Sequence, residues 1–325
     1  QISDSLPFLG LDIESEDKDL VRIEYSPNRP DYSTDYGVAL GLQGLLGIKT
    51  GSVKLAIKKS KNYRISVKPT VSKIRPFVTG IIAKNGKIDD KTIKQLMTMQ
   101  EDLHFGIGRK RKKSSIGIHD LDKISFPLIY TTVSRNHKFI PLNSEKELSI
   151  SEIIADTETG KDYGPLLGQS SQVPIIIDTN EKTVSFPPII NAAITTVTTK
   201  TKNLFVEVTG INKDDAEDML SVVATILQSA GFTLEHIQIS GAKNSSPKLQ
   251  EKKMIVDSSL INQTLGLNLN TSKIISSLKK SRLNALSKGK NIICTIPAYR
   301  FDIFGPMDLV EEVALGYGIQ NFEPT

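Results

Sequence analysis

The sequence is poor in the residues that build disulfides, metal centres and membrane spans. Cys294 is the one cysteine, which excludes an internal disulfide and a zinc site made of cysteines. The four histidines, His104, His119, His137 and His236, form neither a HExxH motif nor a pair at metal-ligand spacing. No GxSxG motif marks a hydrolase serine. No apolar run approaches the roughly 20 residues that span a bilayer, and no secretory signal is recognisable, so no membrane partner is expected.

The composition predicts a soluble globular protein. The 325 residues exceed one typical domain, so two or three domains are expected. Hydrophobic residues make up 38% and charged residues 24% of the chain, as in soluble globular proteins. The net charge of +5 is compatible with nucleic-acid binding but does not establish it. Because the first residue is Gln1 rather than methionine, we expect the chain to begin inside a longer polypeptide.

Hydrophobic periodicity and capping residues predict an α+β protein. The clearest helix covers 214–230, with apolar residues on one face, Asn212 as its cap and Gly231 at its end. The polar segment 241–253 lacks periodicity and predicts a linker, and 58–73 predicts a connector with one strand. The other predicted helices cover 34–46 (capped by Ser33), 90–103, a segment from the capping box 149–152, 258–265, 271–281 and 308–315; the other predicted strands cover 21–25, 77–83, 173–177, 183–186, 203–209, 234–239 and 291–296.

The strongest concentration of positive charge is the basic run Arg109, Lys110, Arg111, Lys112 and Lys113. Five consecutive cations can contact nucleic-acid phosphates, and they can equally form a solvated loop, so both interpretations stay open. The glycines nearby do not form a phosphate-binding loop, because no Gly-Lys-Ser/Thr follows them.

One predicted strand carries polar residues that can bind a ligand. Glu207 and Thr209 are two residues apart, so they share one face of the strand. A carboxylate and a hydroxyl in this arrangement can hold a polar ligand group, although an exposed strand face is the plainer interpretation. Pro187 and Pro188 follow another strand directly, and they predict a rigid turn that ends its pairing.

His119 precedes an aspartate, which invites a catalytic interpretation. No nucleophile is spaced for it, so a structural imidazole in a turn is favoured.

Four carboxylates cluster near the end of the chain. Asp308, Glu311 and Glu312 fall on one face of a predicted helix, and Asp302 precedes it. Like charges this close repel unless a cation lies among them, and oxygen ligands suit Mg²⁺. The alternative is a solvated acidic helix start, where carboxylates favour the positive end of the helix dipole.

The two predicted helices on either side of Gly266 can form a module that reads nucleic acid. The second of them offers only Lys279, Lys280 and Arg282, late in its length, which favours a packed helical corner over a DNA reader.

Short phrases along nearly the whole chain occur in the order found in one known family. The sequence resembles the β subunit of archaeal and eukaryotic phenylalanyl-tRNA synthetase. The large C-terminal domain of that family and the start of its N-terminal module are missing, so the resemblance implies an N-terminal fragment. The matching phrases are 28–31, 100–104, the basic run 109–113, 116–123, 139–143, 185–191, 205–210 and 297–318.

The resemblance implies a multi-domain α+β fold and a cytoplasmic enzyme. It divides the chain into an N-terminal α/β module with a connector (1–66), a central mixed α/β editing domain (67–246) and a small helix-turn-helix-like module (247–325). The family's α₂β₂ tetramer charges tRNA(Phe) with phenylalanine, using Mg²⁺ and ATP at an aminoacylation site in the α subunit. The β subunit hydrolyses Tyr-tRNA(Phe). The expected partners are therefore an α subunit and tRNA(Phe), with no DNA.

The resemblance also assigns site residues. The editing pocket is expected at Ser185, Glu207 and Thr209, with an apolar wall near Ile176. The family often has aspartate at the position of Glu207, which motivates an alternative: a non-catalytic tRNA-binding and scaffolding part of the synthetase. A magnesium site shared within the full enzyme is expected at the four C-terminal carboxylates Asp302, Asp308, Glu311 and Glu312, and tRNA contacts are expected at the basic run Arg109, Lys110, Arg111, Lys112 and Lys113.

Overall fold

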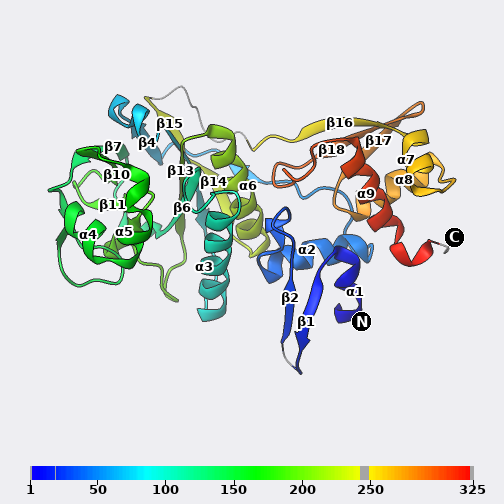
Figure 1. Ribbon diagram of the computed structural model, residues 1–325, viewed down its shortest axis with the longest axis horizontal. Coiled ribbons are helices and arrows are strands. Elements are labelled where there is room, and N and C mark those ends of the chain that lie inside the picture. Colours follow the sequence, from blue (N-terminus) through cyan, green and yellow to red (C-terminus); the bar gives the residue numbers. More distant parts are fainter. Residues whose placement is uncertain (1, 19, 242–248, 323–325) are drawn as a thin grey trace. The chain divides into compact units, whose positions relative to one another are not determined.

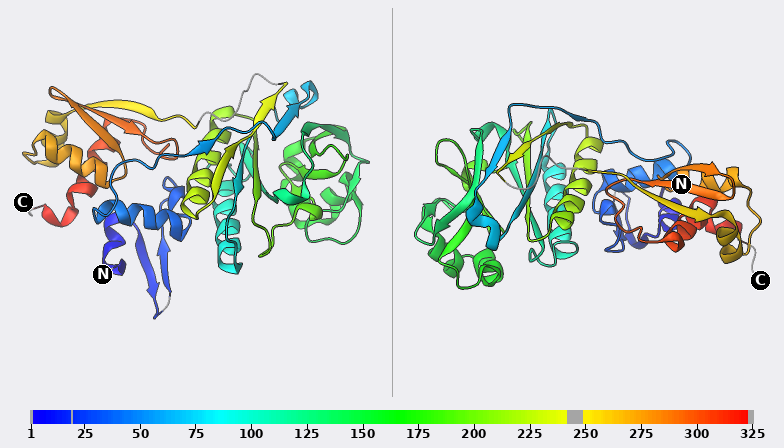
Figure 2. Two further views of the ribbon diagram at one scale, coloured as in Figure 1. Left: turned by 180° about the vertical axis from the view of Figure 1, so that it is seen from behind. Right: turned by 90° about the horizontal axis from the view of Figure 1, so that it is seen from above.

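The computed structural model describes residues 2–18, 20–241 and 249–322, which form two compact units (Figure 1). One unit is continuous and covers Ala56–Leu249. The other combines Gln1–Leu55 with Gln250–Thr325, drawn in blue and in yellow to red (Figure 2). The division into three domains at residues 66 and 246 stays a prediction. No helix in the described ranges is long and apolar enough to cross a membrane.

The central unit contains two β-sheets. In the five-stranded sheet, β13 (Leu204–Gly210) lies between β5 (Phe77–Lys84) and the edge strand β6 (Ser114–Asp120), and all seven residues of β13 are buried. Helix α6 (Lys213–Ser229) packs on β5 and β13, and α3 (Asp90–Phe105) lies beside the edge strand β6. The sheet order is β3 (Ile57–Lys58), β14 (Thr233–His236), β5 (Phe77–Lys84), β13 (Leu204–Gly210) and β6 (Ser114–Asp120).

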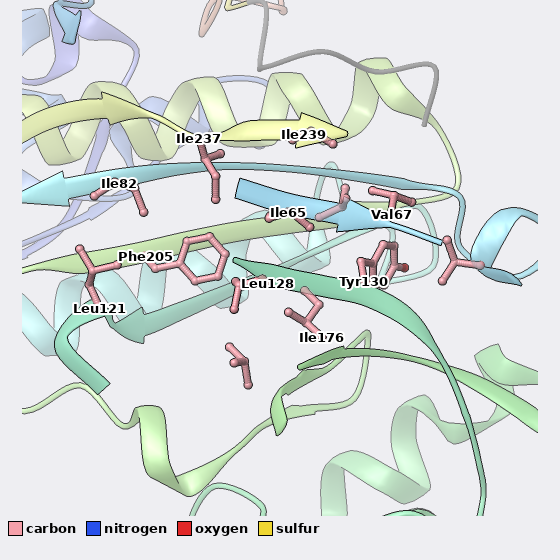
Figure 3. Packing of buried hydrophobic residues seen from close by; sticks show 13 residues of the cluster. Ile65, Val67, Ile82, Leu121, Leu128, Tyr130, Ile176, Phe205, Ile237 and Ile239 are labelled. Atoms are coloured by element: carbon pink, nitrogen blue, oxygen red, sulfur yellow. The ribbon is translucent and has the colours of Figure 1, made fainter. Parts of the chain in front are cut away.

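The six-stranded sheet faces the first across a shared core. Phe205 and Ile82 from the five-stranded sheet meet Tyr130, Ile65 and Ile176 from the six-stranded sheet (Figure 3). Side chains alternate along a strand, so neighbouring residues of β10 serve two cores, one between the sheets and one beneath the short helices. The sheet order is β12 (Ile190–Asn191), β11 (Thr183–Phe186), β10 (Gln172–Ile177), β7 (Leu128–Ser134), β4 (Arg64–Val67) and β15 (Gln238–Ser240).

Two short helices, α4 (Ile150–Asp156) and α5 (Glu158–Tyr163), supply part of the second core, beside the small hairpin of β8 (Lys138–Phe139) and β9 (Leu148–Ser149). The predicted capping box is confirmed: Ser149 Oγ accepts from the Glu152 backbone N–H, and the Glu152 carboxylate accepts from the Ser149 N–H. Such a box satisfies two of the backbone donors that a helix start leaves unpaired.

The N-terminal segment of the other unit holds α1 (Ile2–Ser5), the hairpin β1 (Asp12–Glu16) and β2 (Val21–Glu24), and α2 (Asp35–Leu45). Ser33 was expected to cap this helix, and that expectation is wrong. The cap is Thr34, whose Oγ1 accepts from the Gly37 N–H at 3.2 Å, while the Ser33 hydroxyl donates to the Pro30 carbonyl.

The C-terminal segment is a three-stranded sheet with three helices. The strand order is β16 (Lys252–Asp257), β18 (Asn291–Ile296) and β17 (Asn284–Lys288). Helices α7 (Ser258–Leu265), α8 (Thr271–Lys280) and α9 (Pro306–Tyr317) share its hydrophobic core. Most of the predicted linker, 242–248, lies outside the described residues, and β16 begins inside its last part. The observed architecture is mixed α+β with several sheets, as expected.

Candidate functional site

A cavity of about 340 Å³ opens beside the edge strand β6 of the central unit. Its walls come from α3, from β6, from the turn after β11 and from the segment that follows β12. The cavity is apolar over most of its surface, with polar groups at a few places, which is typical of small-molecule sites. Its apolar lining includes Ile93, Leu96, Met97, Ile116, Ile118, Ile189 and Ile190, and its polar lining includes Gln100, Glu101, Arg111, Ser185, Asn191 and Glu207.

Glu207 and Ser185 meet in the cavity wall although they belong to different sheets. Glu207 is only 2% exposed because its strand β13 lies between β5 and β6 and is buried along its whole length. The Ser185 hydroxyl, on β11, donates to Glu207 Oε1 at 2.9 Å, and Glu207 Oε2 has no partner. Burial raises the pKa of Glu207 to about 7, against the opposing effects of the Ser185 hydrogen bond and of Arg75. A buried carboxyl with a free oxygen can bind a hydroxyl group of a ligand.

Thr209 and Ile176 lie behind the cavity wall. The buried Arg75 holds Thr209: its Nε donates to Thr209 Oγ1 at 2.9 Å, and its Nη2 donates to the Thr209 carbonyl at 2.8 Å and to Ser115 Oγ at 3.1 Å. Ile176 pairs with Ser185 across β10 and β11, but its side chain lies in the core between the sheets. Their expected part in the editing pocket stays a prediction.

The basic run divides into two groups. Arg111 is buried in the cavity wall, where its guanidinium donates to the Ile189 carbonyl at 3.0 Å and pairs with Glu101 at 2.9 Å. Lys113 pairs with Asp215 at 3.2 Å. The remaining three members, Arg109, Lys110 and Lys112, are exposed.

Sequence reasoning did not place Gln100, Glu101, Arg111 or Asn191 in the cavity. The one available signal was helical spacing: Gln100 and Glu101 follow apolar α3 residues by four positions, so they extend its cavity-facing stripe. Gln100 Nε2 donates to the Ile116 carbonyl at 3.2 Å, and Asn191 Nδ2 donates to the Ile118 carbonyl at 3.4 Å. Both side chains therefore bind the edge strand β6.

The four acidic residues of the last module do not converge on a common point. Arg300 is fully buried, pairs with Asp302 at 2.7 Å and also pairs with Glu312. Asp308 Oδ2 accepts the backbone N–H groups of residues 304 and 305 at 2.7 and 2.8 Å, so it caps α9. Glu311 is exposed. Within the described ranges no group of three or more His, Cys, Asp or Glu side chains could hold a metal ion. In this arrangement the residues do not fit a magnesium site.

Arg300 instead belongs to a buried charge cluster with Arg29 and Asp31. Arg29 forms two hydrogen bonds with Asp31, at 3.0 and 2.8 Å, and lies 4.0 Å from the centre of the Tyr32 ring. Burial opposes the charge of Arg300, but Glu312, Asp302 and Asp31 outweigh that effect and raise its pKa well above the ordinary value. The first and last segments of the chain thus share one ionic cluster.

Comparisons with known proteins match both units. A B3/4 domain model matches residues 89–220, and a tRNA synthetase B5 domain model matches residues 254–319. The phenylalanine–tRNA ligase β subunit of Archaeoglobus fulgidus is 38% identical over 98% of this chain and 58% of its own length. That of Sulfurisphaera tokodaii is 39% identical over 100% of this chain and 60% of its own length. The chain therefore spans less than two thirds of these relatives.

A solved structure matches over nearly the whole chain. An N-terminal fragment of the phenylalanyl-tRNA synthetase β subunit from Pyrococcus horikoshii superimposes with a TM-score of 0.92 and 31% identity, covering 97% of this chain and 93% of the fragment. Fold, domain matches and sequence identity agree, so the chain belongs to the family of phenylalanine–tRNA ligase β subunits.

Proposed function

We propose that this chain carries the editing site of a phenylalanine–tRNA ligase and hydrolyses Tyr-tRNA(Phe). The observation that carries this proposal is the Glu207–Ser185 pair in an otherwise mostly apolar cavity. The cavity is within the size range of small-molecule sites, and its apolar walls suit an aromatic ring. Glu207 then hydrogen-bonds the para-hydroxyl of tyrosine.

The chemistry of discrimination supports this assignment. Tyrosine differs from phenylalanine by one hydroxyl, and an apolar aminoacylation site rejects that added hydroxyl only weakly. A second site that hydrogen-bonds the hydroxyl discriminates well, because phenylalanine leaves the polar groups of that site unpaired. The free Oε2 of Glu207 is such a group.

Hydrolysis of the ester needs little acid–base chemistry from the protein. The ester is already reactive, so a positioned water and donors for the developing oxyanion suffice. Arg111 supplies a guanidinium in the cavity wall, and Glu101 holds that guanidinium in place. We assign no general base, and the terminal ribose hydroxyl of the tRNA can assist the water.

The remaining expectations concern the complete enzyme. We infer an α subunit as partner, with aminoacylation, ATP and Mg²⁺ at a site outside this chain. The exposed Arg109, Lys110 and Lys112 contact phosphates of tRNA(Phe). The corner of α7 and α8 with the sheet beside it forms the helix-turn-helix-like module. A cytoplasmic location follows from this function.

Deacylation assays test the proposal directly. The chain is incubated separately with Tyr-tRNA(Phe) and with Phe-tRNA(Phe). It should release tyrosine much faster than phenylalanine. Glu207→Ala should lower hydrolysis of Tyr-tRNA(Phe) about ten- to a hundredfold, since a hydrogen bond to a charged group contributes roughly 1.5–3 kcal/mol. The matched control is Glu235→Ala, which removes a half-buried carboxylate of the same unit that lies outside the cavity and pairs with Lys84.

A second candidate is a non-catalytic tRNA-binding scaffold, favoured by Glu207 at a position where the family often has aspartate. That candidate predicts binding of both aminoacyl-tRNAs without release of either amino acid.

For the editing proposal, equal rates of Tyr-tRNA(Phe) hydrolysis by Glu207→Ala and by the unmodified chain would mean that the pocket lies elsewhere.

A further inference from the structure

One aromatic side chain stands in water where helix α3 ends. Phe105 is the last residue of that helix, and it is 69% exposed. A single exposed apolar residue is ordinary on a protein surface, so its exposure alone indicates nothing. What sets Phe105 apart is its position between the exposed cations of the basic run and the wall of the cavity.

Cations of the basic run lie beside this ring. Lys110 Nζ is 5.5 Å from the ring centre, which is a cation–π distance. Lys110 and its neighbour Arg109 are exposed, and both belong to the left-handed turn 109–111, whose backbone is unfavourable for residues other than glycine. The turn is tied to the end of α3, because the Arg111 N–H donates to the His104 carbonyl at 3.2 Å. The fold thus holds exposed cations next to an exposed aromatic ring.

The ring also adjoins the cavity. Glu101 lines the cavity and pairs with Arg111, which lies in the same wall. Phe105 follows Glu101 by four positions on α3, so it lies on the same side of the helix, about 6 Å further along the axis. Lys110, over the ring, directly precedes Arg111 in the sequence. A ligand that extends out of the cavity past Glu101 therefore meets Phe105.

An exposed aromatic ring among cations is the arrangement that binds single-stranded nucleic acid. The cations attract the phosphates, and the ring stacks on a base of any sequence, because every base has a flat face. A base inside a duplex has both faces covered by its neighbours, so the ring selects unpaired nucleotides. An acidic protein surface would pair with the cations and would leave the ring without a matching group.

We propose that Phe105 is a stacking platform for an unpaired base near the 3′ end of the bound tRNA, with Lys110 and Arg109 at the flanking phosphates. The inference rests on the proposed editing function, since the 3′ end carries the amino acid whose ester enters the cavity. It adds the part of the substrate that is held outside the cavity and the residue that holds it. The base is one of the unpaired nucleotides immediately before the one that carries the amino acid.

The alternative is a structural ring. Phe105 would then serve only to hold the Lys110 ammonium by a cation–π contact and to end the helix. The two interpretations differ in their consequences for binding. Removal of a structural ring changes the stability of the turn, but it changes the affinity for every RNA equally.

A double-mutant cycle on binding tests the proposal. The ligands are uncharged tRNA(Phe), either intact or trimmed of its unpaired 3′-terminal nucleotides, and the proteins are the unmodified chain and Phe105→Leu. Leucine keeps an apolar side chain and favours the helix, but it has no ring to stack. Phe105→Leu should weaken binding of intact tRNA(Phe) by about fivefold to a hundredfold, the usual effect of one lost base–aromatic stack, and should leave the affinity for trimmed tRNA unchanged.

Two further variants separate the ring from general effects of the surface. Phe105→Tyr keeps a stacking ring and should bind intact tRNA(Phe) like the unmodified chain. Ile211→Ala is the matched control, since Ile211 is 47% exposed and donates its N–H to the carbonyl of Lys113 in the same run, but offers no ring. It should bind both tRNAs like the unmodified chain. Unfolding curves of all variants verify that each is folded.

The outcomes are distinct. Equal affinities of folded Phe105→Leu and the unmodified chain for intact tRNA(Phe), or an equal loss on intact and trimmed tRNA, would overturn the role of Phe105. Binding requires no hydrolysis, so the proposed function is judged separately. If the unmodified chain deacylates neither aminoacyl-tRNA, the editing function fails, whereas a chain that releases tyrosine with Phe105→Leu binding normally retains the editing function without the platform.

Discussion

At the scale of single residues, Glu207 lines the cavity and also makes the stability of the folded chain depend on pH. Its carboxyl is buried on the interior strand β13, and burial raises its pKa from 4.5 to about 7. Between pH 4.5 and pH 7, the folded state therefore keeps a proton on Glu207 that the unfolded state has released. The resulting stabilisation is complete below about pH 4.5 and disappears as the pH rises through 7.

Glu207→Gln should remove this dependence, because the amide does not titrate. Above pH 7 the variant should be more stable than the unmodified chain, by an amount on the order of 3 kcal/mol at most, and near pH 4 the difference should shrink. Urea unfolding at a series of pH values measures this difference, with Glu235→Gln, at a half-buried carboxylate outside the cavity, as control. Parallel stability curves for Glu207→Gln and the unmodified chain would show that the carboxyl titrates normally.

Arg300 is a second residue whose charge decides local structure. Without it, the carboxylates of Asp302 and Glu312 would be left buried beside each other. Arg300→Met should therefore lower the free energy of unfolding by about 3–5 kcal/mol, the usual loss when one partner of a buried ion pair is removed. Arg64→Met, on the surface of the other unit, is the control and should have little effect.

The same arrangement predicts the response to magnesium. Because Arg300 already neutralises two of the four carboxylates and Asp308 caps a helix, millimolar Mg²⁺ at constant ionic strength should leave the melting temperature of this chain unchanged. Calorimetry that reveals a tight one-to-one magnesium site would contradict this expectation.

At the scale of elements, the turn between α3 and β6 serves two purposes. Three consecutive residues, Arg109 to Arg111, have positive φ values of 50°, 53° and 61°. This tight left-handed turn points Arg111 into the cavity wall while its neighbours stay exposed. The five-residue basic run thus contains one buried cation in the cavity wall, one cation in an ion pair with Asp215, and three exposed cations.

Replacing Arg109, Lys110 and Lys112 together by alanine should weaken tRNA binding and make it less salt-dependent. Each lost phosphate contact lowers the slope of log affinity against log salt by roughly 0.7–0.9. Binding titrations at several salt concentrations measure the slope, and Lys58, Lys59 and Lys61, exposed in the same unit, provide a matched triple-alanine control. Identical slopes for the two triple variants would mean that the turn makes no specific contact with tRNA.

Local sequence signals predicted some elements and missed others. The helix observed at 213–229 matches the one predicted at 214–230, because its apolar period and its Asn212 cap are both local signals. The Asn212 side chain does accept from two backbone N–H groups. Strand β6, with the sequence SSIGIHD, was not predicted, because Ser and Gly have low strand propensity. Its extended form comes from pairing with β13, a distant segment.

At the scale of the whole molecule, the cavity is built from residues that are far apart in sequence. Glu207 and Ser185 were expected together only through the family resemblance, and the structure places both at the cavity. The convergence of α3, β6 and the segment after β12 depends on tertiary packing. No spacing rule in the sequence relates Arg111 to Ile189 or His119 to Thr195, so these contacts could not be predicted.

The divided unit has a consequence for how the protein is made. Residues 1–55 leave the ribosome before 56–249, and the segment that completes their unit is translated only after all of 56–249. At roughly 5–20 residues per second, that interval is on the order of 10–40 s. During it, the Lys49 carbonyl, the Gly51 N–H and the Arg29–Asp31 pair lack Arg282, Lys279 and Arg300, which are not yet translated. The central unit, once 249 has been translated, can fold while 250–325 is still being made, so it can reach its native structure before the unit that contains residues 1–55.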